Sequence, residues 1–97
     1  MKDSTRTAIA ESLEELAAQD VWDESVWQRC YDVVTENMDE DELLSYVHDD
    51  IIHYSGRRLF RPAPIKADFD AYRQEFRDVA TALRSRMSLA DFKKHYE

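Results

Sequence analysis

The sequence predicts an all-α protein, a small single-domain helical bundle with four main helices and a short C-terminal helix. The 97 residues include one glycine and two prolines, whereas a β-rich domain needs turn residues about every ten positions. Between Ile65 and Met87, apolar residues recur at spacings of three or four, which places them on one face of an α-helix. A chain of this length builds one hydrophobic core, so we expect residues 1–97 to form a single domain.

The first helix is expected at about residues 5–18, with Asp3, Ser4 or Thr5 as its N-terminal cap. Only a short connection separates it from the second helix, so the two should pack antiparallel. The predicted inner face of the first helix consists of Ile9, Leu13, Leu16 and Ala17.

The second helix is expected to begin after Asp23, whose side chain suits an N-cap. Trp22 and Trp27 then occupy the two positions of a hydrophobic staple, a contact that fixes how the chain enters a helix. The helix should end at Glu36 or Asn37, since asparagine tolerates the left-handed backbone conformation that is common just past a helix end.

The third helix has the clearest start signal, a capping box with Asp39 as N-cap and Glu42 three residues later. Met38 and Leu43 occupy the positions of the matching staple. Gly56, the only glycine, lies where a left-handed residue would end the helix. The predicted inner face consists of Leu44, Val47, Ile51 and Tyr54.

The fourth helix follows a loop with two prolines and is expected to be the longest, from Ile65 to Met87. Ser88 and Asp91 form a further capping box, which predicts a short fifth helix over residues 89–95. The outer face of the fourth helix carries a mostly basic row, which consists of Lys66, Asp70, Arg73, Arg77 and Arg84.

The net charge of −8 is unevenly spread along the chain. Residues 1–56 contain 15 acidic and 3 basic residues, whereas residues 57–97 contain 6 acidic and 10 basic residues. An acidic chain is repelled by nucleic acids and by anionic membranes, and it is attracted to basic proteins. The alternative is that the two halves neutralise each other within the fold.

The acidic candidates for partner binding are Asp39, Glu40, Asp41, Glu42, Asp49 and Asp50. We interpret them as a contact surface for a basic protein. The structural alternative is that acids in a first helical turn stabilise the helix dipole by about 0.3–1 kcal/mol each. In composition the chain resembles nuclease-immunity proteins and polyanion mimics, small acidic helical proteins that block a basic partner, although no motif carries the comparison.

The basic residues suggest an alternative function in anion or nucleic-acid recognition. Guanidinium groups suit phosphate, and the neighbouring Phe60 could stack on a base. Alternatively, Leu59 and Phe60 insert into the bundle while the arginines pair with the acidic half. The residues of this anion-binding alternative are Arg57, Arg58, Arg61, Arg73, Arg77 and Arg84.

His48, Asp49, Asp50 and His53 invite a metal or acid–base interpretation, because both carboxylates lie within one helical turn of His53. Catalytic metals usually need three protein ligands, so a surface histidine paired with a carboxylate is the expected arrangement. Cys30 is expected to be buried and to pack in the core, because acidic surroundings raise the pKa of a thiol and so disfavour the thiolate that a nucleophile needs. With no Gly-rich phosphate loop, zinc-type cysteine pair or recognisable catalytic triad, we expect no catalytic residue, metal or cofactor.

We therefore expect a non-enzymatic intracellular interaction protein, an inhibitor or regulator that presents its acidic surface to a basic protein. The alternative is a nucleic-acid-associated regulator that uses the Arg57–Arg61 loop and the basic face of the fourth helix. The fourth helix could also mediate a homodimer if it projects beyond its shorter neighbours. A single cysteine gives no disulfide framework, and no segment resembles a signal peptide or a membrane span, so we expect a cytoplasmic protein.

Overall fold

The computed structural model describes residues 1–55 and 70–96, and this part of the chain contains helices and no β-strand. The main helices are α1 (Asp3–Ala18), α2 (Glu24–Glu36), α3 (Glu42–Ser55) and α4 (Asp70–Arg84). A 3-10 helix, η1 (Met38–Glu40), precedes α3, and a short helix, α5 (Leu89–Tyr96), follows α4. The predicted all-α fold, with four main helices and a short C-terminal helix, is confirmed.

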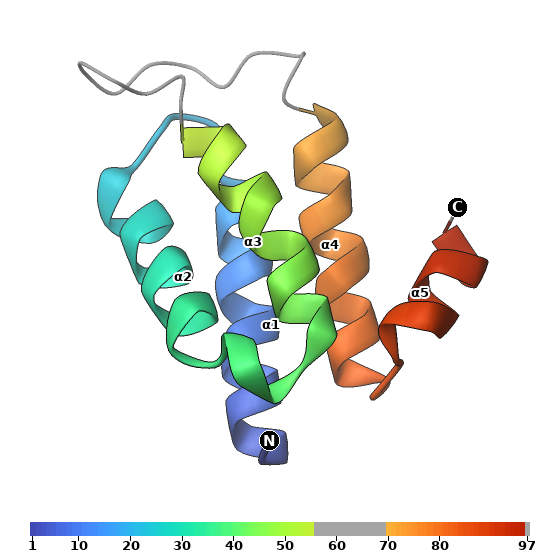
Figure 1. Cartoon of the computed structure of the whole chain (residues 1–97). Coiled ribbons are helices and arrows are strands. Elements are labelled where there is room, and N and C mark those ends of the chain that lie inside the picture. The colour runs from blue at the N-terminus through green and yellow to red at the C-terminus, as the bar shows by residue number, and fades with distance from the viewer. Residues whose placement is uncertain (56–69, 97) are drawn as a thin grey trace.

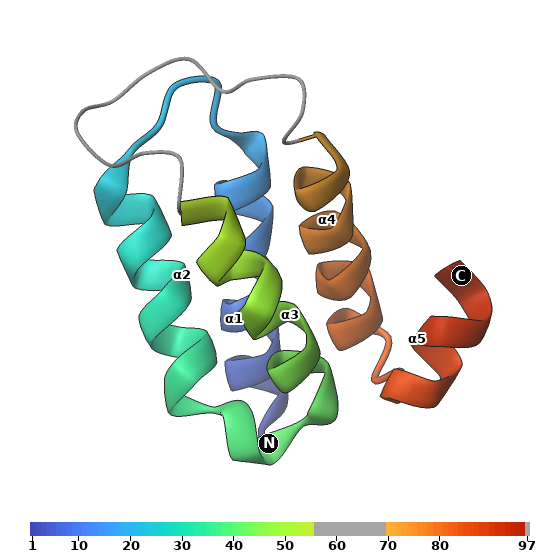
Figure 2. The ribbon, with the colours of Figure 1, turned by 45° about the horizontal axis from the view of Figure 1, so that its top comes forward.

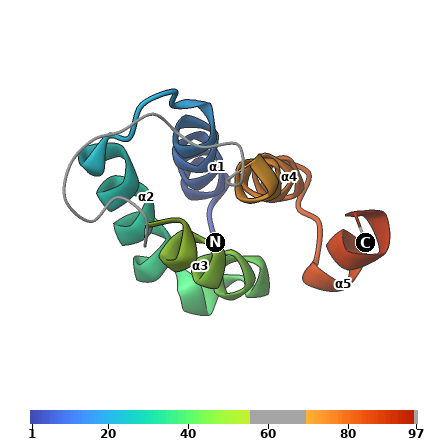
Figure 3. The same ribbon diagram turned by 90° about the horizontal axis from the view of Figure 1, so that it is seen from above.

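Helices α1 to α4 run alternately up and down, so that neighbouring helices are antiparallel (Figure 1, Figure 2). Seen from above, they surround a common centre, and α1 lies between α2 and α4 (Figure 3). The most extensive helix–helix interface is that between α1 and α4. Helix α5 lies outside this ring and packs against α3 and α4.

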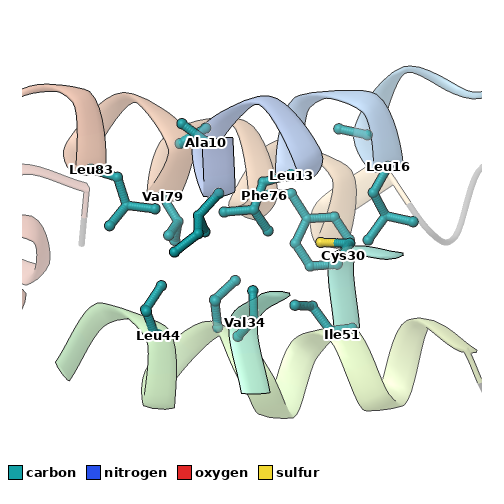
Figure 4. Close-up of a cluster of buried hydrophobic side chains, with 14 of the residues drawn as sticks. Ala10, Leu13, Leu16, Cys30, Val34, Leu44, Ile51, Phe76, Val79 and Leu83 are labelled. Carbon is teal, nitrogen blue, oxygen red and sulfur yellow. The ribbon is translucent and has the colours of Figure 1, made fainter. Parts of the chain in front are cut away.

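A single cluster of apolar side chains fills the space between the four main helices (Figure 4). The predicted inner faces of α1 and α3 are buried throughout, and Phe76, Val79 and Leu83 of α4 are fully buried as well. Tyr72 and Met87 are partly buried and pack against this core. Fully burying one such side chain contributes roughly 1.5–3 kcal/mol, so the periodic apolar faces explain why the helices associate.

Two of the predicted helix caps are confirmed. Asp23 Oδ1 accepts a hydrogen bond from the backbone N–H of Ser25 at 2.9 Å. Bonds from the hydroxyl and backbone N–H of Ser25 lower the pKa of Asp23. At the start of α5, Ser88 Oγ accepts from the backbone N–H of Asp91 at 3.1 Å. Both side chains satisfy amides that have no partner within the helix.

The capping box predicted at Asp39 and Glu42 is wrong. Asp39 lies within η1, and α3 begins only at Glu42. The N-cap is Asp41, which has an extended backbone and accepts a hydrogen bond from Leu43 N at 2.9 Å. Each of the four consecutive acids from Asp39 to Glu42 could have been the cap. Because the short 3-10 helix includes Asp39, the cap lies two residues later, at Asp41.

The ends of other helices also differ from the prediction. Helix α1 starts at Asp3 with Lys2 in the cap position and no side-chain cap, so none of the three proposed residues caps it. Asn37 at the end of α2 has φ −114° and ψ 10°, outside the left-handed region. Helix α5 extends to Tyr96, one residue further than predicted.

Helix α4 ends at Arg84, three residues before the predicted end at Met87. Its last turn closes with Met87 N bonded to Ala82 O at 2.9 Å and Arg86 N bonded to Leu83 O at 3.2 Å. This pattern is a Schellman motif, with Arg86 in its left-handed position at φ 56°. The predicted start at Ile65, and Gly56 with its capping role, lie outside the described residues.

Candidate protein-binding surface

The six acidic candidates separate into two groups. Asp39, Glu42 and Asp49 have exposed side chains and form no ion pair within residues 1–55 and 70–96. Glu42 and Asp49 are seven residues apart on α3, a spacing that places them on one face of the helix. Asp39 lies in η1, which packs against α3. We call these three residues the acidic patch.

Glu40 and Asp41 instead have contacts that stabilise the fold. Asp41 Oδ2 lies 3.1 Å from Arg6 Nη1, and these side chains are only 15% and 16% exposed, so the ion pair is largely withdrawn from solvent. The same carboxylate caps α3. Glu40 Oε2 lies 3.4 Å from the amino group of Met1. Neutralising Asp41 would therefore disturb the fold as well as the surface charge, whereas the Glu40 side chain is 53% exposed in its pair, which contributes little to stability.

Asp50 is half-buried next to the acidic patch. Burial raises the pKa of the Asp50 carboxyl, the charge of His53 opposes this shift, and the charge of Asp49 adds to it. Beside these acids Ile52 is 42% exposed, one of the two large apolar side chains that stand out at the described surface. An exposed apolar side chain beside carboxylates is a suitable contact for a protein partner.

The basic row predicted on the fourth helix is mostly engaged in contacts within the molecule. Arg84 Nη2 lies 2.6 Å from Glu14 Oε1 of α1, and the hydrogen bond to Glu14 raises the pKa of Arg84. Arg73 pairs with Asp70, and Arg77 donates to Gln74 Oε1 at 3.1 Å. The remaining candidates, Arg57, Arg58, Arg61 and Lys66, lie outside the described residues.

Two arginines that sequence reasoning did not single out also join distant parts of the chain. Arg6 pairs with Asp41, and Arg86 pairs with Asp3. The members of these pairs are 35 and 83 residues apart in the sequence, so no local pattern could have indicated them. The Arg86–Asp3 and Arg84–Glu14 pairs neutralise two acids at the interface of α1 and α4, whereas the Arg6–Asp41 pair joins α1 to the start of α3.

Cys30 and the histidines of α3 are the remaining candidates for chemistry. Cys30 is fully buried, and desolvation, with a smaller effect of Glu15, raises the pKa of its thiol to about 12. His48 lies against Tyr31 with ring centroids 5.5 Å apart. Among the residues that the structure describes, no three His, Cys, Asp or Glu side chains are grouped as metal ligands would be.

Comparison of the chain with protein-family models, with curated proteins and with solved structures found no match. None of the described helices combines the length and the apolar character that crossing a lipid bilayer requires.

Proposed function

We propose that this chain is a non-enzymatic intracellular interaction module, an inhibitor or regulator that binds a basic protein through the acidic patch. The observation that carries the proposal is a contrast between two faces. At the α1–α4 interface, the acids Asp3 and Glu14 are paired with arginines. On η1 and α3, the three acids of the patch are exposed and unpaired within the described chain.

The chemistry of the patch favours a protein as the ligand. Exposed carboxylates attract a basic partner over distances of about 8–10 Å at physiological salt and accelerate its association. They repel nucleic acids and anionic membranes for the same reason. Ile52 adds an apolar contact that releases water on binding.

The experiment that tests this function is an affinity capture from native lysate at low and high salt, with and without nuclease. The bait is compared with a patch variant, Asp39→Asn, Glu42→Gln and Asp49→Asn. We expect a basic protein that survives nuclease, is released at high salt and is lost with the patch variant. Equal capture by both baits would exclude the patch as the binding surface.

The matched control is a second triple variant, Glu11→Gln, Asp20→Asn and Asp91→Asn. These acids are also exposed and form no ion pair within the described chain. Asp91 occupies the first turn of α5 as Glu42 occupies that of α3, so both variants lose one favourable dipole interaction. The control should retain the partner, because it changes the net charge equally without touching the patch.

The alternative function, nucleic-acid association through the Arg57–Arg61 loop and α4, has its own test. On α4, the described arginine that is exposed and in no ion pair is Arg77. A gel shift at low salt that disappears when Arg57, Arg58 and Arg61 become Ala would support this function. Absence of a shift with the intact protein would exclude it.

A further inference from the structure

A second feature of the molecule is a surface hollow of about 350 Å³ beside the start of α1 and the end of α4. Its lining residues are Asp3, Arg6, Thr7, Arg84 and Arg86. These segments meet because α1 and α4 are antiparallel, so the first turns of one lie beside the last turn of the other (Figure 1, Figure 2). The concentration of three arginines at one hollow is unexpected in a chain of net charge −8.

Each guanidinium of this hollow is oriented by a carboxylate. Arg6 pairs with Asp41, Arg84 with Glu14, and Arg86 with Asp3. A guanidinium has five N–H donors, and one carboxylate engages at most two of them. Donors therefore remain for a ligand, and the carboxylates restrict the motion of the side chains that carry them.

Arg6 supplies the second observation. Its Nε atom is buried and has no hydrogen-bond partner in the part of the chain that the structure describes. Arg6 nevertheless lines the hollow, and a guanidinium that is only 16% exposed is screened little by solvent, so its charge acts strongly on an anion placed there.

Asp3 is the carboxylate that lines the hollow itself. Asp3 and Arg86 are 67% and 66% exposed in their ion pair, and such exposed pairs contribute little to stability. An incoming anion can therefore displace the Asp3 carboxylate from Arg86 at small cost.

We propose that this hollow binds a small phosphate-bearing molecule. A phosphate group takes the place of the Asp3 carboxylate at Arg86 and accepts hydrogen bonds from Arg84 as well, while the positive charge of Arg6 in the lining adds to the attraction. The ligand must be compact, because the carboxylates of Glu11, Glu14 and Asp41 on the surrounding surface repel an extended polyanion. This site is separate from the acidic patch and does not depend on the function proposed for it.

The test is a calorimetric titration of the full chain with inorganic pyrophosphate at low ionic strength. Two variants carry opposite expectations. Arg86→Gly removes a ligand-binding guanidinium while relaxing the left-handed backbone, so it should fold and bind about tenfold more weakly. Asp3→Asn removes the competing carboxylate and should bind severalfold more tightly.

Arg29→Gln is the matched control, because Arg29 is likewise exposed and paired with a carboxylate, Glu15, away from the hollow. It should bind pyrophosphate as the unmodified chain does. Absence of binding by the unmodified chain, equal weakening in Arg29→Gln and Arg86→Gly, or weaker binding by Asp3→Asn would each overturn the proposal.

A short single-stranded oligonucleotide is the competing ligand in the same titration. Suppose that the unmodified chain binds the oligonucleotide more tightly than pyrophosphate, and that Arg86→Gly changes the affinity for the oligonucleotide. The hollow then contacts nucleic acid, and the compact-ligand proposal is wrong. The patch variant should bind pyrophosphate at least as well as the unmodified chain, which separates this result from failure of the proposed function.

Discussion

Arg84 Nη2 lies 2.6 Å from Glu14 Oε1, and this ion pair joins the acidic half of the sequence to the basic half. The two residues are 70 positions apart in the sequence, and the packing of α1 against α4 brings them together. Arg86 and Asp3 make a second connection at the same interface. These two ion pairs neutralise Glu14 and Asp3 beside α4, whereas the three acids of the acidic patch stay exposed and form no ion pair within the described chain.

The first prediction concerns the left-handed residue that ends α4. Replacing Arg86 by glycine should stabilise the fold by about 1 kcal/mol, because glycine adopts φ 56° without the steric cost that a Cβ imposes. Urea denaturation measures the change. Arg86→Ala is the control, since it removes the same side chain but keeps the Cβ. If Arg86→Ala is as stable as Arg86→Gly, the backbone conformation stores no strain.

The second prediction concerns the hydrogen bond that links α2 to α3. Trp27 Nε1 donates to the backbone oxygen of Ile51 at 3.0 Å inside the core. Trp27→Phe removes this bond and leaves unfilled volume, so it should destabilise the fold by about 1–3 kcal/mol. Trp22→Phe is the control, because Trp22 is as buried as Trp27 and loses the same volume, but the hydrogen bond from its indole to Glu24 is only partly buried. Denaturation midpoints that rank the two variants in the opposite order would contradict this account.

The third prediction concerns Asp50 and pH. Burial raises the pKa of Asp50 above the ordinary value of 3.8, while His53 opposes and Asp49 reinforces the shift. A raised carboxyl pKa means that the folded state loses stability as pH rises from 3.8 through the folded pKa. Asp50→Asn should therefore be more stable than the unmodified chain at pH 7, and the advantage should disappear in acid. A variant less stable at pH 7 would show that the charged form of Asp50 is favoured.

The fourth prediction concerns Cys30. Because burial raises its pKa to about 12, the thiolate fraction at pH 8 is roughly a thousandfold below that of an ordinary thiol. The native chain should resist alkylation by iodoacetamide, and the urea-unfolded chain should react readily. Rapid labelling of the native chain, followed by mass spectrometry, would be inconsistent with a buried structural cysteine.

Local sequence signals predicted much of the fold. The spacing of apolar residues identified the buried faces of α1 and α3 because helix geometry repeats every 3.6 residues. Asp23 and Ser88 were correct caps, since each is followed at once by amides that need an acceptor. The same logic failed at Asp39, where neighbouring acids compete for the cap and a 3-10 helix selected Asp41.

The candidate sites were less predictable because they depend on contacts between distant residues. The sequence indicated an acidic surface, but only the fold separates Asp39, Glu42 and Asp49 from Asp41, which Arg6 neutralises. The hollow of Arg6, Arg84 and Arg86 had no sequence signal. The apolar spacing continues to Met87, so the pattern predicted helix where the chain in fact turns. That turn places Arg86 at the hollow.

The most direct test of the acidic patch is the dissociation constant of the captured basic partner, measured over a range of salt concentrations. The unmodified chain and the control variant Glu11→Gln, Asp20→Asn, Asp91→Asn should both lose affinity steeply with salt. The patch variant Asp39→Asn, Glu42→Gln, Asp49→Asn should bind about tenfold or more weakly at low salt, with a flatter salt dependence. Equal affinity and equal salt dependence for all three proteins would contradict the assignment of the patch as the binding surface.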